Sequence, residues 1–190
     1  MGAPEIRLID ATTSPDGEGY LYTCLVPLTF RRYRKRAHYL EAAIRGGFRK
    51  EVILMDGNAV GMIEYAPAPA SAYPISGPRA WVMNCIWVLR RAKGHRYGKM
   101  LVGRMIDAAK EANGFATMAL EGHWSPWFRL NEMEYLGYES IDSRLMRHRF
   151  KKPDIRFRVH LMWMPLREGA GEPMMDWQRL SKGVDFCIAH

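Results

Sequence analysis

Apolar and polar residues follow one another along this chain in segments whose spacing predicts both strands and helices. Two short apolar runs, 51–55 and 59–65, lie on either side of Asp56-Gly57. An Asp-Gly pair between apolar runs is a strong signal for a β-hairpin. The range 81–89 is almost continuously apolar, which is typical of a strand buried on both faces. The pattern therefore predicts a hairpin followed by a buried central strand.

Three other segments carry apolar residues at helical spacing. The range 28–44 does so and ends at Gly46-Gly47, a signal for the end of a helix. A second helix follows the central strand, and its apolar stripe contains Tyr97, Leu101, Met105, Ala108 and Ala112. Ser125-Pro126 supplies an N-cap and a first-turn proline for a third helix that runs toward Leu136.

The remaining segments complete a mixed pattern of strands and helices. The ranges 5–10, 115–120 and 156–164 read as strands, whereas the proline-rich range 66–78 has no pattern that a regular element could follow. The order is strand, helix, hairpin, strand, loop, helix, strand, helix and strands. It predicts an α/β or α+β fold with one mixed sheet. We place one domain at residues 1–166, and residues 167–190 form a tail packed on it or extending from it.

Composition indicates an ordinary globular protein with excess positive charge. The 190 residues are 48% hydrophobic, and the formal net charge is +8. No apolar run reaches the roughly 20 residues that cross a bilayer, and the first residues lack the layout of a secretory signal. Three widely spaced cysteines predict neither a disulfide framework nor a zinc site. We therefore expect a reduced, cytoplasmic protein without a metal and without a membrane partner.

Much of the positive charge lies in two clusters. The first is the range 31–36, and the second contains Arg144, Arg147, Arg149, Lys151, Lys152, Arg156 and Arg158. Such clusters attract polyanions such as nucleic acid, anionic lipid or a multiply phosphorylated cofactor. They are also typical of a solvated surface, and the sequence leaves both interpretations open.

A basic glycine loop joins the central strand to the second helix. It reads Lys93-Gly94-His95-Arg96-Tyr97-Gly98-Lys99. The first N–H groups of a helix have no internal partner and carry partial positive charge, so a glycine loop at this end can cradle a phosphate. A Walker A loop would need Ser or Thr in place of Met100, and the glycine spacing does not match a dinucleotide-binding fingerprint.

The segment from Ile86 to Leu101 resembles the cofactor segment of the GNAT-family N-acetyltransferases. That family has the signature Arg/Gln-x-x-Gly-x-Gly/Ala between a central strand and a long helix, and the range 93–98 lies at the corresponding place and keeps its last glycine, Gly98. Two positions depart from the signature, because Lys93 stands at the first position and Arg96 at the central glycine. The resemblance covers about 51–143 and implies a single GNAT-like domain whose central mixed sheet is mostly antiparallel and flanked by helices.

The resemblance also implies an activity. It implies transfer of an acetyl group from acetyl-CoA, a co-substrate, to a primary amine of a small molecule or peptide by direct attack. The cofactor-binding residues it implies are Trp87, Val88, Lys93, Gly94, His95, Arg96, Tyr97, Gly98 and Lys99. The alternative is a GNAT fold that binds acyl-CoA without turnover, as a sensor or interaction module. A nucleic-acid partner and a homodimer are further open alternatives.

Acetyl transfer needs a base for the amine and an acid for the departing thiolate. In the family, a tyrosine four residues before the closing glycine often serves as the acid, but this chain has Met133 there. The candidate bases are Glu64, at the end of an apolar strand, and Glu121 and His123, at the end of another. Glu64 is equally compatible with a surface position at a strand end, and a histidine such as His123 more often forms hydrogen bonds in a loop than acts as a base. Cys85 is a weaker candidate nucleophile, because a free cysteine within a strand usually packs as a small hydrophobe.

Overall fold

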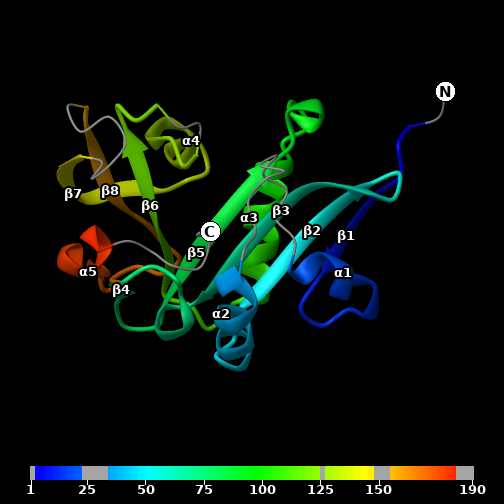
Figure 1. Ribbon diagram of the computed structural model, residues 1–190, viewed down its shortest axis with the longest axis horizontal. Coiled ribbons are helices and arrows are strands. Elements are labelled where there is room, and N and C mark those ends of the chain that lie inside the picture. The colour runs from blue at the N-terminus through cyan, green and yellow to red at the C-terminus, as the bar shows by residue number, and fades with distance from the viewer. Residues whose placement is uncertain (1–2, 23–33, 125–126, 148–154, 183–190) are drawn as a thin grey trace.

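The fold is a central sheet with helices on both faces, as a computed structural model shows for residues 3–22, 34–124, 127–147 and 155–182 (Figure 1). The seven strands of the sheet have the order β1-β2-β3-β5-β6-β8-β7. Their bounds are β1 Ile6–Asp10, β2 Arg49–Met55, β3 Asn58–Pro67, β5 Ala80–Val88, β6 Gly114–Glu121, β7 Glu139–Arg147 and β8 Arg156–Pro165. Two short strands, β4 (Ile75–Ser76) and β9 (Met174–Met175), form a second sheet. The mixed, mostly antiparallel sheet confirms the expected fold class.

Five α-helices and three short 3-10 helices surround the sheet in the described part of the chain. The α-helices are α1 Glu18–Leu21, α2 Arg34–Arg45, α3 Tyr97–Ala108, α4 Leu130–Tyr135 and α5 Trp177–Ser181. The 3-10 helices are η1 Pro15–Gly17, η2 Ala68–Ala70 and η3 Arg90–Ala92. Figure 1 shows α2 in front of the sheet and α3 behind it. None of the helices within the described ranges is long and apolar enough to span a membrane.

The predicted hairpin is present as β2 and β3. Its turn places Asp56 at φ 49° and Gly57 at φ 73°. Positive φ at both central residues is what a type I′ turn requires, and Asp-Gly adopts it at low cost. The register shifts by one residue between Ile53 and Leu54, a bulge that the sequence does not indicate.

Strands β5 and β6 separate soon after they begin, and this positions the site. They pair in parallel only along Ala80–Val82 and Gly114–Ala116. Beyond that point the Thr117 hydroxyl donates a 2.8 Å hydrogen bond to the Met83 carbonyl, so one backbone group exposed by the separation is satisfied. The two strands therefore diverge toward their C-terminal ends, where a ligand can enter between them.

Two of the expected helix boundaries were wrong. Helix α3 ends at Ala108, before Ala112, because the chain turns there and the Asn113 N–H bonds the Arg79 carbonyl. Helix α4 begins at Leu130, later than expected, because the preceding residues run beside β6 and the Leu120 N–H bonds the Phe128 carbonyl at 2.7 Å. The expected N-cap, Ser125-Pro126, lies outside the described residues, as does the range 28–33 of the first expected helix.

Two other segments differ from the expected pattern. The proline-rich range 66–78 contains the end of β3, helix η2 and strand β4. Strand β7 was not expected, because most of its residues are exposed and it lacks an apolar alternation. In the tail, β9 pairs with β4, and the Trp177 indole donates a 2.9 Å hydrogen bond to Asp142. The domain division at residue 166 stays a prediction.

Glu51 is a buried carboxylate whose environment opposes its charge. It is 2% exposed, and its Oε2 has no hydrogen-bond partner among the described residues. Burial raises the pKa of Glu51 above its ordinary value, and so does Asp10, which lies opposite on β1. The Glu51 carboxyl group therefore keeps its proton to higher pH in the folded state than in the unfolded state. As a result, the free energy of unfolding falls as pH rises from about 4.3, the ordinary pKa of glutamate, through the raised pKa of Glu51.

We expect Glu51→Gln to remove this loss. The variant should be more stable than the parent at pH 7 by about 1 kcal/mol, because an amide is cheaper to bury than a carboxylate. Urea unfolding at a series of pH values measures both effects, with Glu111→Gln on the exposed surface as the control. Equal stability of parent and Glu51→Gln at every pH would contradict the assignment.

Candidate active site

A cleft of about 700 Å³ opens where β5 and β6 diverge. Its walls come from the end of β5, the basic loop, the first turn of α3, and α4 with the residues just before it. The lining residues are Ile86, Trp87, Val88, Arg90, Ala92, Lys93, Gly94, Arg96, Tyr97, Gly98, Phe128, Arg129, Glu132, Met133, Tyr135 and Leu136. A volume of this size suits a cofactor or a drug-sized molecule.

The first turn of α3 faces this cleft with its N–H groups available. Arg96 is the N-cap residue, and no side chain caps the helix there. Gly94 has φ 92°, and a Cβ built on it would meet nothing within 4 Å, so the loop has open space on that side. Uncapped N–H groups, the helix dipole and an open glycine loop together suit the binding of an anion.

Charged side chains strengthen the preference of the cleft for an anion. Four of its lining residues are cationic, namely Arg90, Lys93, Arg96 and Arg129, and one is anionic, Glu132. A cleft lined mostly by one sign of charge concentrates ligands of the opposite sign. Arginine also donates charge-assisted hydrogen bonds to phosphate. The cleft therefore suits a multiply phosphorylated ligand.

Seven of the nine expected cofactor-binding residues line the cleft. They are Trp87, Val88, Lys93, Gly94, Arg96, Tyr97 and Gly98. The other two do not. His95 stacks on Tyr97 at 5.3 Å, and the Lys99 ammonium lies 4.3 Å from the ring centroid of Tyr135. That second contact links α3 to α4 beside the cleft.

Sequence reasoning missed four polar residues of the cleft. Arg90 follows the central strand, and Arg129, Glu132 and Tyr135 belong to α4 and its N-cap. Arg90 could have been found from its place between the strand and the glycine loop. The other three could be placed in the cleft only if the start of α4 at Leu130 were known, and the proline at 126 indicated an earlier start.

Arg96 occupies a backbone conformation that favours glycine. Its φ is 57° and its ψ is 23°, in the left-handed region, where a side chain costs about 1 kcal/mol. We expect Arg96→Gly to stabilise the fold by about 0.5–1 kcal/mol and to weaken binding of a phosphorylated ligand about 10-fold, since a cation is lost. Urea unfolding and a ligand titration measure the two changes. An affinity that stays the same would show that the Arg96 side chain does not contact the ligand.

Glu64 is not the lone strand-end carboxylate that the sequence indicated. It lies within β3, opposite Lys50 on β2, and its Oε1 is 3.0 Å from the Lys50 ammonium. The Glu64 side chain is 0% exposed and the Lys50 side chain is 1% exposed. On its other side β3 pairs with β5, and there Glu64 lies opposite Cys85. It therefore borders the strand that forms one wall of the cleft, but it does not line the cleft itself.

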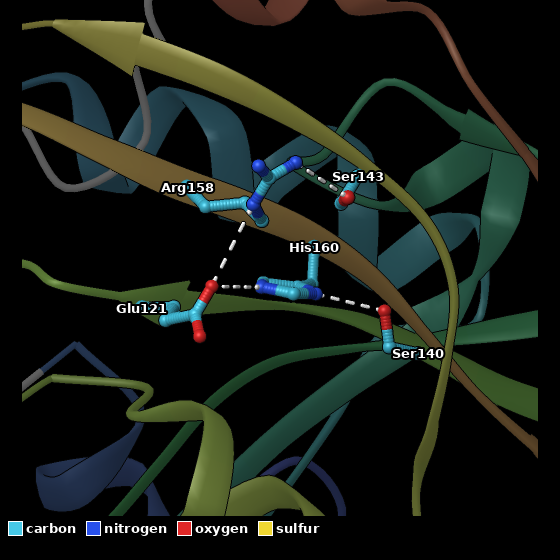
Figure 2. Close-up of polar contacts among 5 residues, drawn as sticks. All are labelled: Glu121, Ser140, Ser143, Arg158 and His160. Carbon is cyan, nitrogen blue, oxygen red and sulfur yellow. Dashed lines mark hydrogen bonds and ion pairs between the residues drawn. The ribbon is translucent and has the colours of Figure 1, made fainter.

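Glu121 belongs to a polar network that spans three strands (Figure 2). Its Oε2 lies 3.3 Å from His160 Nε2 and 3.6 Å from Arg158 Nε. His160 Nδ1 lies 2.8 Å from the Ser140 hydroxyl, and Arg158 donates to the Ser143 hydroxyl at 3.2 Å. Glu121 comes from β6, the serines from β7, and Arg158 and His160 from β8. The network ties these strands together, and Glu121 does not line the cleft.

The remaining residues singled out by the sequence are placed as follows. His123 stacks on Trp124 and contacts the edge of the Phe157 ring, and it also lies outside the cleft lining. Cys85 is buried and 4% exposed. Met133 lines the cleft at the position where the family often has its acid. No group of three or more His, Cys, Asp or Glu residues in the described ranges could hold a metal ion.

Comparison with known proteins agrees with this geometry. The model of the acetyltransferase (GNAT) family matches residues 18–123. A search of curated proteins finds no matching relative. Several solved structures share the fold. A ribosomal-protein-alanine N-acetyltransferase from Brucella melitensis is 19% identical, covers 85% of this chain and 99% of its own, and has a TM-score of 0.54.

Two other solved structures are similar. A GNAT family acetyltransferase from Elizabethkingia anophelis with acetyl-CoA bound is 13% identical over 85% of this chain and 98% of its own, with a TM-score of 0.54. A putative GNAT acetyltransferase from Desulfovibrio desulfuricans is 8% identical over 86% of this chain and 100% of its own, with a TM-score of 0.58. At these identities the likeness is one of fold. The family model spans more than half of the chain and the elements from β2 to β6, including the basic loop, and the chain therefore belongs to the GNAT acetyltransferase family.

Proposed function

We propose that this protein is an acetyl-CoA-dependent N-acetyltransferase that acts on a primary amine of a small-molecule or peptide acceptor. The observation that carries the proposal is the cationic cleft at the point where β5 and β6 diverge, with the uncapped start of α3 at its edge. Family membership supports it, and so does the fold likeness to the Elizabethkingia anophelis acetyltransferase with acetyl-CoA bound.

The lining residues fit the parts of acetyl-CoA. Lys93, Arg96 and the loop N–H groups would hold the pyrophosphate, and Gly94 and Gly98 leave room for it. Ile86 and Val88 offer an apolar strand edge beside which the pantetheine arm would lie. Acetyl-CoA supplies the activated acetyl thioester, which the amine attacks directly. The chain has to position the two groups, accept the amine proton and supply a proton to the thiolate.

Glu64 is the base that we carry forward. Its carboxylate is buried, Lys50 fixes its position, and its strand borders β5. Glu121 and His123 remain the alternatives. We expect Glu64→Gln to lower kcat about 100-fold or more, because general base catalysis contributes on this scale. The change also removes the carboxylate charge beside the buried Lys50 ammonium and should lower stability, so an unchanged acetyl-CoA Kd is needed to show that the variant is folded. Glu121→Gln and His123→Asn are the matched comparisons. A larger loss in either would assign the base to that residue and contradict the role of Glu64.

The acid is not the usual tyrosine, because Met133 occupies that position and has no proton to donate. Tyr138 is completely buried, and its hydroxyl donates a 3.7 Å hydrogen bond to Met83 Sδ. Burial raises the pKa of Tyr138 above its ordinary value. Tyr138 also lies outside the cleft lining. We therefore propose that a water molecule or another group protonates the thiolate.

The test of function is acetyl transfer to defined amines. The protein is incubated with acetyl-CoA and a panel of peptides with free N-termini, lysine peptides, polyamines and amino sugars, and mass spectrometry detects the added acetyl group. Acetylation of one class, with release of CoA, supports the proposal. Tight acetyl-CoA binding without acetylation of any amine would favour the second candidate, a non-catalytic acyl-CoA-binding sensor, to which Met133 and Arg96 point. A cytoplasmic location and a homodimer stay predictions.

A further inference from the structure

The end of the β7–β8 hairpin is a separate basic surface, which we call the arginine ribbon and define as Arg144–Arg147 of β7 and Arg156–Val159 of β8. Strand β7 is the outer edge of the sheet. Strand β6 ends at Glu121, which pairs with Arg158, so the end of the ribbon projects beyond the third strand. Figure 1 shows this hairpin at the far side of the sheet from β1.

The arginine ribbon concentrates positive charge, and among its arginines the described carboxylates pair only with Arg158. It holds Arg144, Arg147, Arg156 and Arg158 among its eight residues, and it holds no acidic residue. Glu121 pairs with Arg158, and no described carboxylate forms an ion pair with Arg144, Arg147 or Arg156. A surface of this composition attracts anions.

Two of these arginines oppose each other directly. Arg147 and Arg156 form a cross-strand pair in the register of β7 and β8. Like charges at directly opposite positions destabilise a sheet, and a carboxylate at either position would pair better. The pair is therefore a cost to the folded chain alone. A polyanion lying across the two strands would relieve it.

The arrangement suits an extended anion rather than a small one. Successive strand residues point to opposite faces, so Arg147, Arg156 and Arg158 share one face and Arg144 lies on the other. Four guanidinium groups on two faces cannot converge on one phosphate. A chain of phosphates that passes along and around the ribbon can reach all of them.

Aromatic side chains lie next to the ribbon. His123 contacts the Phe157 ring at 4.7 Å and stacks on Trp124 at 5.3 Å and 28°. Trp124 is 54% exposed, which is unusual for so large an apolar side chain. Phe157 lies between Arg156 and Arg158 along β8, so its ring is on the face that carries Arg144. An exposed aromatic ring beside cationic side chains is a feature with which proteins bind single-stranded nucleic acid, through the backbone phosphates and base stacking.

From this juxtaposition we infer that the arginine ribbon, with the His123–Trp124 pair, binds single-stranded nucleic acid. The inference goes beyond the proposed acetyl transfer and does not depend on it. The ribbon residues do not line the cleft, so nucleic-acid binding and acetyl-CoA binding can be measured separately.

The test uses the full chain and a fluorescein-labelled RNA of about 20 nucleotides, longer than the site size of a typical single-strand-binding domain. Fluorescence anisotropy is measured over a range of salt concentrations. The double variant Arg147→Ala/Arg156→Ala should bind about 10-fold more weakly, with a log–log salt slope less negative by about 1.4, since each lost phosphate contact contributes about 0.7. Trp124→Ala should weaken binding about 10-fold by removing a stacking partner.

The matched control is Arg45→Ala/Lys110→Ala, which removes the same charge from exposed positions at the end of α2 and after α3, away from the hairpin end. It should leave RNA affinity within about 2-fold of the parent. Urea unfolding of both double variants shows that each is folded. Equal RNA affinity of the ribbon variant and the control, absence of RNA binding, or tighter binding to phosphatidylserine vesicles or to duplex RNA than to the single strand would overturn the inference.

Discussion

Gly98→Trp should abolish acetyl-CoA binding while leaving the fold intact. Gly98 lines the cleft in the first turn of α3, and a Cβ built there already meets Leu136 of α4 at 3.4 Å. An alanine at this position would touch Leu136 without serious overlap, but an indole would fill the gap between α3 and α4 where the phosphates are proposed to lie. We expect a loss of affinity of at least about 100-fold, because the anion can no longer reach the helix N–H groups.

Ligand-induced stabilisation measures this loss. Acetyl-CoA at about 100 times its Kd should stabilise the parent protein by about 2.7 kcal/mol, visible as a rise in Tm, and should leave the Tm of Gly98→Trp unchanged. Gly103→Trp is the matched control, since it places the same side chain on α3 where a Cβ meets nothing within 4 Å. If Gly98→Trp is still stabilised by acetyl-CoA like the parent, the cleft is not the cofactor site.

Lys50→Met should destabilise the protein by about 3–5 kcal/mol, because it removes the cation that lies 3.0 Å from the buried Glu64 carboxylate in the sheet interior. Both side chains are almost inaccessible to solvent, and the Lys50 ammonium also lies 3.4 Å from the Leu21 carbonyl. In contrast, replacing both members of a buried pair by apolar residues is often neutral. The double variant Lys50→Met/Glu64→Leu should therefore recover most of the lost stability.

Urea unfolding of the two variants and the parent provides the comparison. The exposed pair of Arg7 and Asp16, at 3.4 Å with side chains 54% and 70% exposed, supplies the control. Arg7→Met should cost less than about 1 kcal/mol, because surface ion pairs contribute little. A loss in Lys50→Met no larger than in Arg7→Met, or a double variant no more stable than Lys50→Met, would contradict the account of this pair.

The fold could be predicted well where local signals are strong. Asp56-Gly57 determines the turn of the β2–β3 hairpin, the long apolar run gives β5, and the glycine loop marks the start of α3. Local sequence signals fail where contacts with distant parts of the chain determine the secondary structure. Proline at 126 suggested a helix start, but the Phe128 carbonyl accepts a hydrogen bond from the Leu120 N–H of β6, and the helix begins only at Leu130. Strand β7 is stabilised by its neighbour β8 and has almost no apolar alternation of its own.

The candidate site also has a part that local sequence predicts and a part that it does not. The expected cofactor-binding residues lie close together in sequence, at the end of β5 and in the basic loop, and seven of the nine line the cleft. The partners of Glu64 and Glu121 are distant in sequence and depend on register. Counting back from the Asp-Gly turn does not place Lys50 opposite Glu64, because a bulge at Ile53 shifts the pairing by one residue. Likewise, His160 meets Glu121 only because β8 inserts between β6 and β7.

Calorimetric titration of the protein with acetyl-CoA, beside CoA that lacks its 3′-phosphate, tests the central claim most directly. We expect one site per chain with micromolar affinity for acetyl-CoA, corresponding to about −8 kcal/mol. We also expect weaker binding of the dephosphorylated cofactor, since the cleft residues Arg90, Lys93, Arg96 and Arg129 favour each added phosphate. Absence of binding at millimolar acetyl-CoA would contradict the assignment of this cleft as the cofactor site.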